Sequence, residues 1–162
     1  MTTKYHRFET TGSNLFQCFQ AEIPTILFRG PVMLAYLYGS MVDGSALPTN
    51  DLDIGLVLEP GCALSAYERI QSEFNIAAEI ERCCGVRERD VRALDVAPLA
   101  VQGRVVSEGV LLQSKVEAFC GQYEISTRKR YFDFLLVVEM MRTSFFQQKN
   151  KEGLIHGKTR KG

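Results

Sequence analysis

Residues 39–53 read GSMVDGSALPTNDLD, and this stretch decides which fold the rest of the chain is expected to take. Residues 32–38 (VMLAYLY) before it form a nearly continuous apolar run, which is typical of a strand covered on both faces. Residues 51–58 (DLDIGLVL) alternate, which places Asp51 and Asp53 on one face of a second strand and large aliphatic side chains on the other. The sequence therefore predicts a strand, a Gly-Ser turn, a loop and an Asp-x-Asp pair at the start of the next strand.

The two aspartates are expected to lie close together, because residues i and i+2 of a strand project to the same face. Two carboxylates at such a separation repel each other unless a cation lies between them. Mg²⁺ suits this position, since it prefers carboxylate oxygens and keeps room for water and phosphate ligands. Asp51 and Asp53 are therefore predicted magnesium ligands.

Gly39 and Ser40 stand at the end of the first predicted strand. Glycine lets a ligand approach the backbone closely, and backbone N–H groups and a serine hydroxyl can donate hydrogen bonds to phosphate oxygens. We expect Gly39, Ser40 and the loop residue Gly44 to bind the phosphates of a nucleoside triphosphate. The loop lacks the G-x-x-x-x-G-K-[ST] pattern, which argues against a P-loop NTPase.

A third carboxylate is needed if the site activates an attacking hydroxyl, and Asp90 is the candidate. Residues 90–96 (DVRALDV) read as a strand, and an amphipathic helix over 64–84 supplies the crossover that would place it beside the Asp-x-Asp strand. Asp90 would bridge two metal ions and help remove the proton of the incoming hydroxyl. Asp95 falls on the opposite strand face and is predicted to be a surface or turn-capping residue. Arg92 either contacts phosphate or forms a structural ion pair.

The remaining segments predict more helix. Residues 13–28 read as a helix that Pro24 divides or whose last turn it opens, and a short helix begins after Pro98. The helix 64–84 is expected to present its apolar residues to the core. They are Leu64, Tyr67, Ile70, Phe74, Ala77, Ile80 and Cys84.

The C-terminal third is expected to be helical from Lys115, with a break at residues 126–130. Residues 131–146 are apolar almost all round, so they predict a helix that is covered on more than one side, either under the sheet or against another chain. Residues 149–162 are basic and polar and predict a disordered tail.

Composition limits the setting of the protein. Nineteen Lys and Arg residues balance nineteen Asp and Glu residues in the 162-residue chain, so direct binding to nucleic acid is not expected. No apolar run approaches the length of a membrane span, and the N-terminus lacks the hydrophobic core of a signal peptide, which predicts a cytoplasmic protein. The five cysteines have no metal-ligand spacing and are expected to be reduced thiols. They are Cys18, Cys62, Cys83, Cys84 and Cys120.

Gly39-Ser40, ten intervening residues and Asp51-x-Asp53 together resemble the signature of the minimal nucleotidyltransferases of the DNA polymerase β-like superfamily. The resemblance extends over residues 30–112, in which AYLYGS, DLDIGLVL and DVRALDVAPLAVQGRVVSEGVLL look like family segments. It implies an α+β fold with a small mixed β-sheet flanked by helices. It places the core at about 30–112 and C-terminal helices at about 115–148, within a single domain over 1–148.

The same resemblance implies Mg²⁺-dependent transfer of AMP from ATP to a hydroxyl, with two metal ions. Family members this short are commonly antitoxins paired with an all-helical HEPN ribonuclease toxin, to one of whose tyrosines they add AMP. Such a partner would make the protein part of a hetero-oligomer.

The sequence departs from the family pattern at two places. Met41, Val42 and Asp43 stand where the family often has basic residues, and Asn50 replaces the serine that usually precedes Asp-x-Asp. Because Asp43 places a negative charge near the expected phosphates, two other functions stay open. One is a catalytically weak module that neutralises a toxin by binding, and the other is transfer to a small molecule such as an aminoglycoside.

Overall fold

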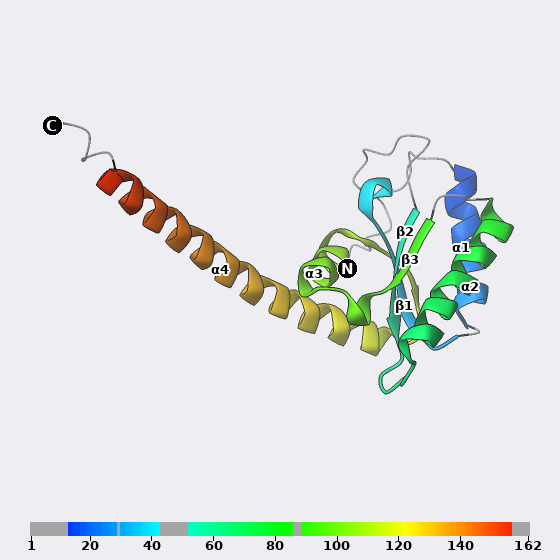
Figure 1. Ribbon diagram of the computed structural model, residues 1–162. Coiled ribbons are helices and arrows are strands. Elements are labelled where there is room, and N and C mark those ends of the chain that lie inside the picture. Colours follow the sequence, from blue (N-terminus) through cyan, green and yellow to red (C-terminus); the bar gives the residue numbers. More distant parts are fainter. Residues whose placement is uncertain (1–12, 29, 43–51, 86–88, 157–162) are drawn as a thin grey trace.

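The computed structural model describes residues 13–28, 30–42, 52–85 and 89–156, and it has the predicted α+β architecture (Figure 1). The helices are α1 (Ser13–Phe28), α2 (Ala66–Cys84), α3 (Leu99–Glu108) and α4 (Glu117–His156), and the strands are β1 (Val32–Tyr38), β2 (Leu52–Leu58), β3 (Arg89–Ala93) and β4 (Val110–Ser114). Two 3₁₀ turns, η2 (Gly39–Met41) and η3 (Leu94–Val96), follow β1 and β3.

The four strands form one mixed sheet in the order β3-β2-β1-β4. β1 pairs antiparallel with both β2 and β4, whereas β2 and β3 are parallel. The parallel pair needs a crossover, and α2 supplies it, as the sequence predicts. This topology places the ends of β1, β2 and β3 that carry the predicted site at one edge of the sheet.

Helices cover both faces of the sheet, as Figure 1 shows. α1 and α2 lie over one face, where the core includes Ile23, Leu27, Ala35, Leu37, Leu52, Ile54, Leu56, Ile76, Ile80 and Val91. α3 and the first half of α4 lie over the other face, where Leu34, Tyr36, Val57, Leu94, Val105 and Cys120 form a second buried cluster. Because both faces are covered, the apolar run of β1 is buried on both sides, as expected.

α2 forms where it is predicted, and Ala77, Ile80 and Cys84 pack in the core as expected, but the first half of the helix differs from the prediction. A capping box between Ser65 and Glu68 starts the helix. Tyr67, Ile70 and Phe74, which were expected in the core, are 62–73% exposed. Glu73 is buried in their place, because its carboxylate accepts a hydrogen bond of 2.7 Å from the backbone N–H of a β3 residue. The first half of α2 therefore faces β3 through Glu73 rather than through the expected apolar residues.

β3 is shorter than predicted, since the chain turns into η3 after Ala93. The turn brings the Leu94 side chain over Gly55, where an added Cβ would lie 2.9 Å from a Leu94 methyl carbon. Asp95 accepts a hydrogen bond of 2.9 Å from the backbone N–H of Leu58. Asp95 is exposed, as predicted, but it lies in η3 rather than in the strand and bonds the end of β2 rather than capping its own turn.

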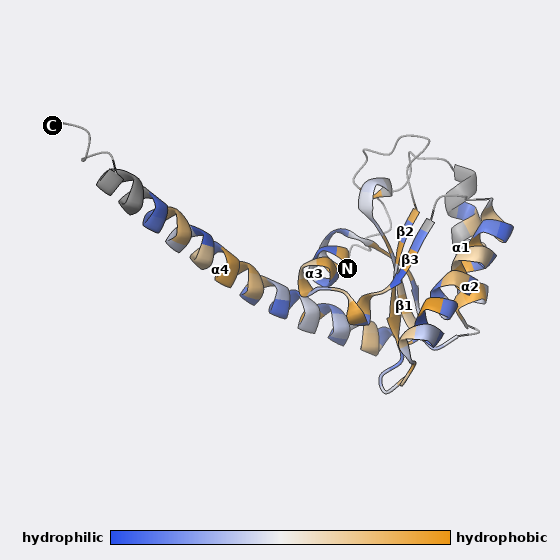
Figure 2. Ribbon diagram, in the orientation of Figure 1, coloured by the Kyte–Doolittle hydropathy of each residue, from blue (hydrophilic) through white to orange (hydrophobic). Residues whose placement is uncertain are grey.

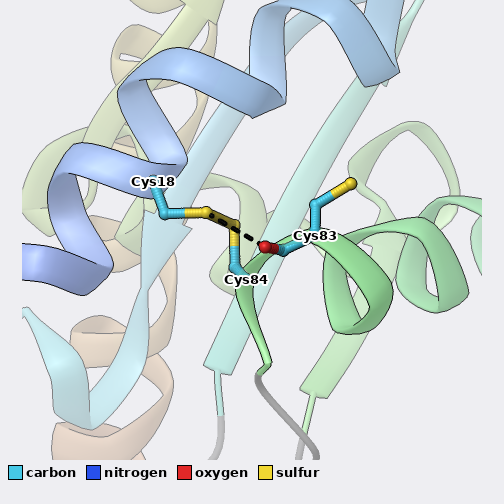
Figure 3. Close-up of a disulfide and its surroundings, with 3 residues drawn as sticks. All are labelled: Cys18, Cys83 and Cys84. Atoms are coloured by element: carbon cyan, nitrogen blue, oxygen red, sulfur yellow. Dashed lines mark hydrogen bonds between the residues drawn. A yellow bond between two sulfur atoms is a disulfide. The ribbon is translucent and has the colours of Figure 1, made fainter.

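The prediction that all five cysteines are reduced thiols is wrong, because Cys18 and Cys84 form a disulfide (Figure 3). Cys18 lies on α1 and Cys84 at the end of α2, and the packing of these helices brings the two Cα atoms to 5.9 Å. The Sγ atom of Cys18 lies 3.6 Å from the carbonyl oxygen of Cys83. The separation of 66 residues along the chain hid this pairing from the sequence.

α4 is one continuous helix of 40 residues, so the break expected at residues 126–130 is absent from it. The polar side chains of this stretch find partners. Thr127 is buried, and Arg128 donates to the carbonyl oxygen of Val106 at 3.0 Å and pairs with Glu124 at 3.0 Å. The contacts of Arg128 with Val106 and Glu124 therefore stabilise the helix in a segment whose composition suggested an interruption.

The second half of α4 projects away from the rest of the protein (Figure 1). Every residue over 132–149 is exposed, which excludes the alternative that residues 131–146 pack under the sheet. The helix continues to His156, so the tail predicted as disordered from Lys149 is helical up to that residue. No helix in the described part of the chain combines the length and hydrophobicity that a membrane span requires.

Candidate functional site

Three side chains line up across neighbouring strands, at the end of the sheet where β1 ends and β2 and β3 begin. Asp53 of β2 is the register partner of Tyr38 in β1 and of Asp90 in β3. Paired residues of adjacent strands project to the same face, so the two carboxylates and the phenol are neighbours. The structure thus brings together two of the three predicted carboxylates, although 37 positions separate them along the chain.

The Gly-Ser turn contacts this row directly. Gly39 starts η2 with φ of 76°, a left-handed conformation that glycine adopts without strain. A Cβ at Gly39 would overlap the Oδ2 atom of Asp53, so only a glycine lets the backbone lie against that carboxylate. Ser40 follows inside the same turn and is partly exposed. The predicted phosphate-binding turn and the predicted metal ligand are therefore in contact.

Arg92 forms an ion pair with Asp90, with 2.7 Å between Nε and Oδ1. Both side chains are about half exposed or more, so the pair lies at the rim of the site. Asp90 is the main reason that the pKa of Arg92 is raised above its ordinary value. Of the two roles open to Arg92, the structure has the ion pair.

Sequence reasoning missed Tyr38, which belongs to the same row. Burial raises its pKa above the ordinary value, the charges of Asp53 and Asp90 raise it further, and Arg92 lowers it. The position of Tyr38 directly before Gly39, opposite Asp53 in an antiparallel pair, was the available signal.

A cavity of about 320 Å³ opens beside the turn, at the low end of the volumes of small-molecule sites. β1 and η2 contribute one wall, and α3 contributes the other. The lining residues are Tyr38, Gly39, Val42, Ala100, Val101, Arg104, Val105, Glu108 and Gly109. The α3 residues were not predicted as site residues, because nothing in the sequence connects them with the turn.

The remaining predicted residues, Asp51 and Gly44, lie outside the described residues, as does Asp43. Within the described ranges, no three His, Cys, Asp or Glu side chains gather into a group that could hold a metal ion. Asp53 and Asp90 nevertheless fit magnesium, since both offer carboxylate oxygens on one face of the sheet, beside the Gly39 turn. The three-carboxylate site stays a prediction.

Solved structures with the same fold come from toxin–antitoxin complexes. A chain of a toxin–antitoxin complex with AMP-PNP matches with a TM-score of 0.62 and 18% identity, over 78% of this chain and 98% of that chain. A chain from a complex of tri-AMPylated Shewanella oneidensis HEPN toxin with MNT antitoxin matches with a TM-score of 0.60 and 17% identity, over 81% of this chain and 98% of that one. A chain of the MntA–HepT toxin–antitoxin matches with a TM-score of 0.59 and 17% identity, over 80% of this chain and 98% of that chain.

These identities are low, so the likeness shows the fold alone. No curated protein matches the chain. Residues 22–118 match the family described as polymerase beta, nucleotidyltransferase, and this range includes the whole sheet and the row of Tyr38, Asp53 and Asp90. Since the match spans more than half of the sequence, the chain belongs to the polymerase β nucleotidyltransferase family.

Proposed function

We propose that the protein is a Mg²⁺-dependent nucleotidyltransferase that transfers AMP from ATP to a tyrosine hydroxyl of a partner HEPN ribonuclease toxin and acts as its antitoxin. One observation carries the proposal: Asp53 and Asp90 stand at paired positions on one face, and the Gly39 turn lies against Asp53. Carboxylates beside a Gly-Ser turn suit a metal-bridged triphosphate.

Asp53 and Asp90, together with Asp51, would hold the metal. When bound, magnesium neutralises charge on the triphosphate and makes the attacking hydroxyl easier to deprotonate. The backbone N–H groups of the Gly39 turn and the Ser40 hydroxyl would donate hydrogen bonds to phosphate oxygens. The contact between Gly39 and Asp53 keeps phosphate and carboxylate at a fixed separation.

Asp90 is the candidate for taking the proton from the incoming hydroxyl. Arg92 holds its Oδ1 atom at 2.7 Å, which fixes the orientation of the carboxylate. The exposure of the pair means that an acceptor on another protein can reach it.

The proposed partner follows from the structural neighbours, whose own descriptions name HEPN toxin, MNT antitoxin and AMPylation. AMP-PNP in another of these complexes supports ATP as the nucleotide.

The test incubates the chain with its HEPN partner, Mg²⁺ and ATP labelled at the α-phosphate. Wild type should label a tyrosine of the toxin, and Asp53→Asn should abolish labelling while the fold is retained. Asp95→Asn is the matched control, because an asparagine oxygen can still accept the hydrogen bond from Leu58 N–H. Asp95 lies outside the carboxylate row, so this variant should keep wild-type labelling.

The other outcomes identify the alternatives. Label on an added aminoglycoside but not on protein would favour small-molecule transfer. A tight complex with the toxin that carries no label, and that Asp53→Asn leaves unchanged, would favour neutralisation by binding. Wild-type labelling by Asp53→Asn would refute the assignment of Asp53.

A further inference from the structure

The side of α4 that packs on the body continues, uncovered, into the projecting half. Cys120 and Thr127 are buried against the body, and the ring of Tyr131 packs so closely on α3 that a Cβ at Gly103 would overlap it. Steps of three and four residues stay on one side of a helix. From Tyr131 such steps lead to Phe134, Val138, Met141 and Phe145, which we call the distal face.

All four residues of the distal face are exposed, from 38% for Phe134 to 69% for Met141. The colouring of Figure 2 shows hydrophobic residues along this projecting part of α4. Phe134 and Phe145, 38% and 57% exposed, alone leave about 190 Å² of aromatic surface in water if a ring side chain presents about 200 Å². Val138 and Met141, 40% and 69% exposed, enlarge the patch to a few hundred Å², about the size of the functional patches that soluble proteins carry.

The position of the distal face connects it with the site. α3 packs on α4 at Tyr131, and α3 also forms one wall of the cavity beside Gly39. α3 covers one side of α4 as far as Tyr131, and the distal face continues along that same side. A protein that covers the distal face would therefore lie directly beyond α3 along the helix. Such a protein lies next to α3, which lines the cavity beside Gly39.

We propose that the distal face is the docking surface for the acceptor protein, which packs an apolar helix of its own against Phe134, Val138, Met141 and Phe145. This inference rests on the proposed function, from which the HEPN toxin is taken as the acceptor, and an apolar stripe with this spacing suits packing of a helix against it. Docking beside α3 raises the local concentration of the acceptor tyrosine at the site. The surface is separate from the catalytic residues.

Two neighbouring methionines supply a matched pair of variants. Met141 lies on the distal face and Met140 points away from it, and their exposed fractions are 69% and 70%. Met141→Asp and Met140→Asp thus make the same chemical change at equal exposure on a helix that projects from the body. Helical content and thermal unfolding should stay the same for both variants.

The experiment measures binding of each purified variant to its HEPN toxin by calorimetry, and AMP labelling of that toxin over a range of toxin concentrations. Met141→Asp should weaken binding at least tenfold, because it places a charge where a large apolar side chain is buried. Its labelling rate should recover at saturating toxin, which is a change in KM without a change in kcat. Met140→Asp should stay within about twofold of wild type.

Each result supports or overturns the proposal. If both variants weaken toxin binding equally, or if Met141→Asp does not weaken it, the docking proposal is overturned. Labelling of the toxin by wild type in the same experiment would leave the proposed function intact. Toxin binding without labelling by wild type would refute the proposed function, and the binding data alone would still decide the docking surface. A dimer of the chain alone that Met141→Asp dissociates would assign the distal face to a second copy and overturn the proposal.

Discussion

Replacement of Gly39 by alanine should displace the Asp53 carboxylate from its position against the Gly39 turn. The added methyl would overlap Oδ2 of Asp53 and lie 3.2 Å from its Cγ, so the carboxylate must move by about 1 Å to reach ordinary carbon contact distances. A misplacement of this size costs catalysis on the order of a hundredfold. The left-handed φ of 76° adds about 1–2 kcal/mol of destabilisation for any residue with a Cβ.

Gly61→Ala separates these two effects. Gly61 also has a left-handed φ, 80°, but nothing lies within 4 Å of an added Cβ, and its turn lies at the other end of β2. Both variants should therefore lose about 1–2 kcal/mol of unfolding free energy in a urea titration from the left-handed φ, and the overlap with Asp53 should add to the loss in Gly39→Ala alone. Only Gly39→Ala should lose AMP transfer in the labelling assay. Equal transfer by the two variants would refute the idea that Gly39 is required for its contact with Asp53.

Two further predictions concern stability. Gly55→Ala should destabilise the protein by about 1–3 kcal/mol in urea unfolding, because the added methyl would lie 2.9 Å from a methyl carbon of buried Leu94. Combining it with Leu94→Val should recover part of this loss. If the double variant instead loses the full sum of the two single losses, the contact does not cause the destabilisation. Burial raises the pKa of Tyr123 from 10.0 to about 12, so the folded state holds a proton that the unfolded state loses between about pH 10 and 12. The unfolding free energy should accordingly fall as the pH rises through this window. Tyr123→Phe should make this fall shallower in urea titrations at several pH values. If the unfolding free energy of the variant falls with pH as steeply as that of wild type, Tyr123 is not its source.

Much of the fold could be predicted because local patterns and tertiary packing agree. The strand over 32–38 and the helix over 13–28 coincide with β1 and α1, and the crossover by α2 follows from the parallel pairing of β2 and β3. The candidate site depends on the same regularity. Once β3 lies beside β2, the register brings Asp90 level with Asp53.

The sequence misled where a distant partner decided the structure. Glu73 is buried because β3 offers it a backbone N–H, and that partner cannot be read from the helix itself. The Cys18–Cys84 disulfide depends likewise on how α1 packs on α2. Tyr38 was overlooked because it looks like one more apolar strand residue until β2 and β3 are paired beside it.

The cystine makes the first half of the protein a macrocycle, since it closes the chain between Cys18 and Cys84. A protease cut within residues 43–51 would place Gly39 on one polypeptide and Asp53 on another, yet the sulfur bridge and the β1–β2 ladder would keep the two pieces in one molecule. Such a nicked protein would run as a single band without reductant and as two with it. The Gly39 turn and the carboxylates of the candidate site would then be separable pieces of a single covalent assembly.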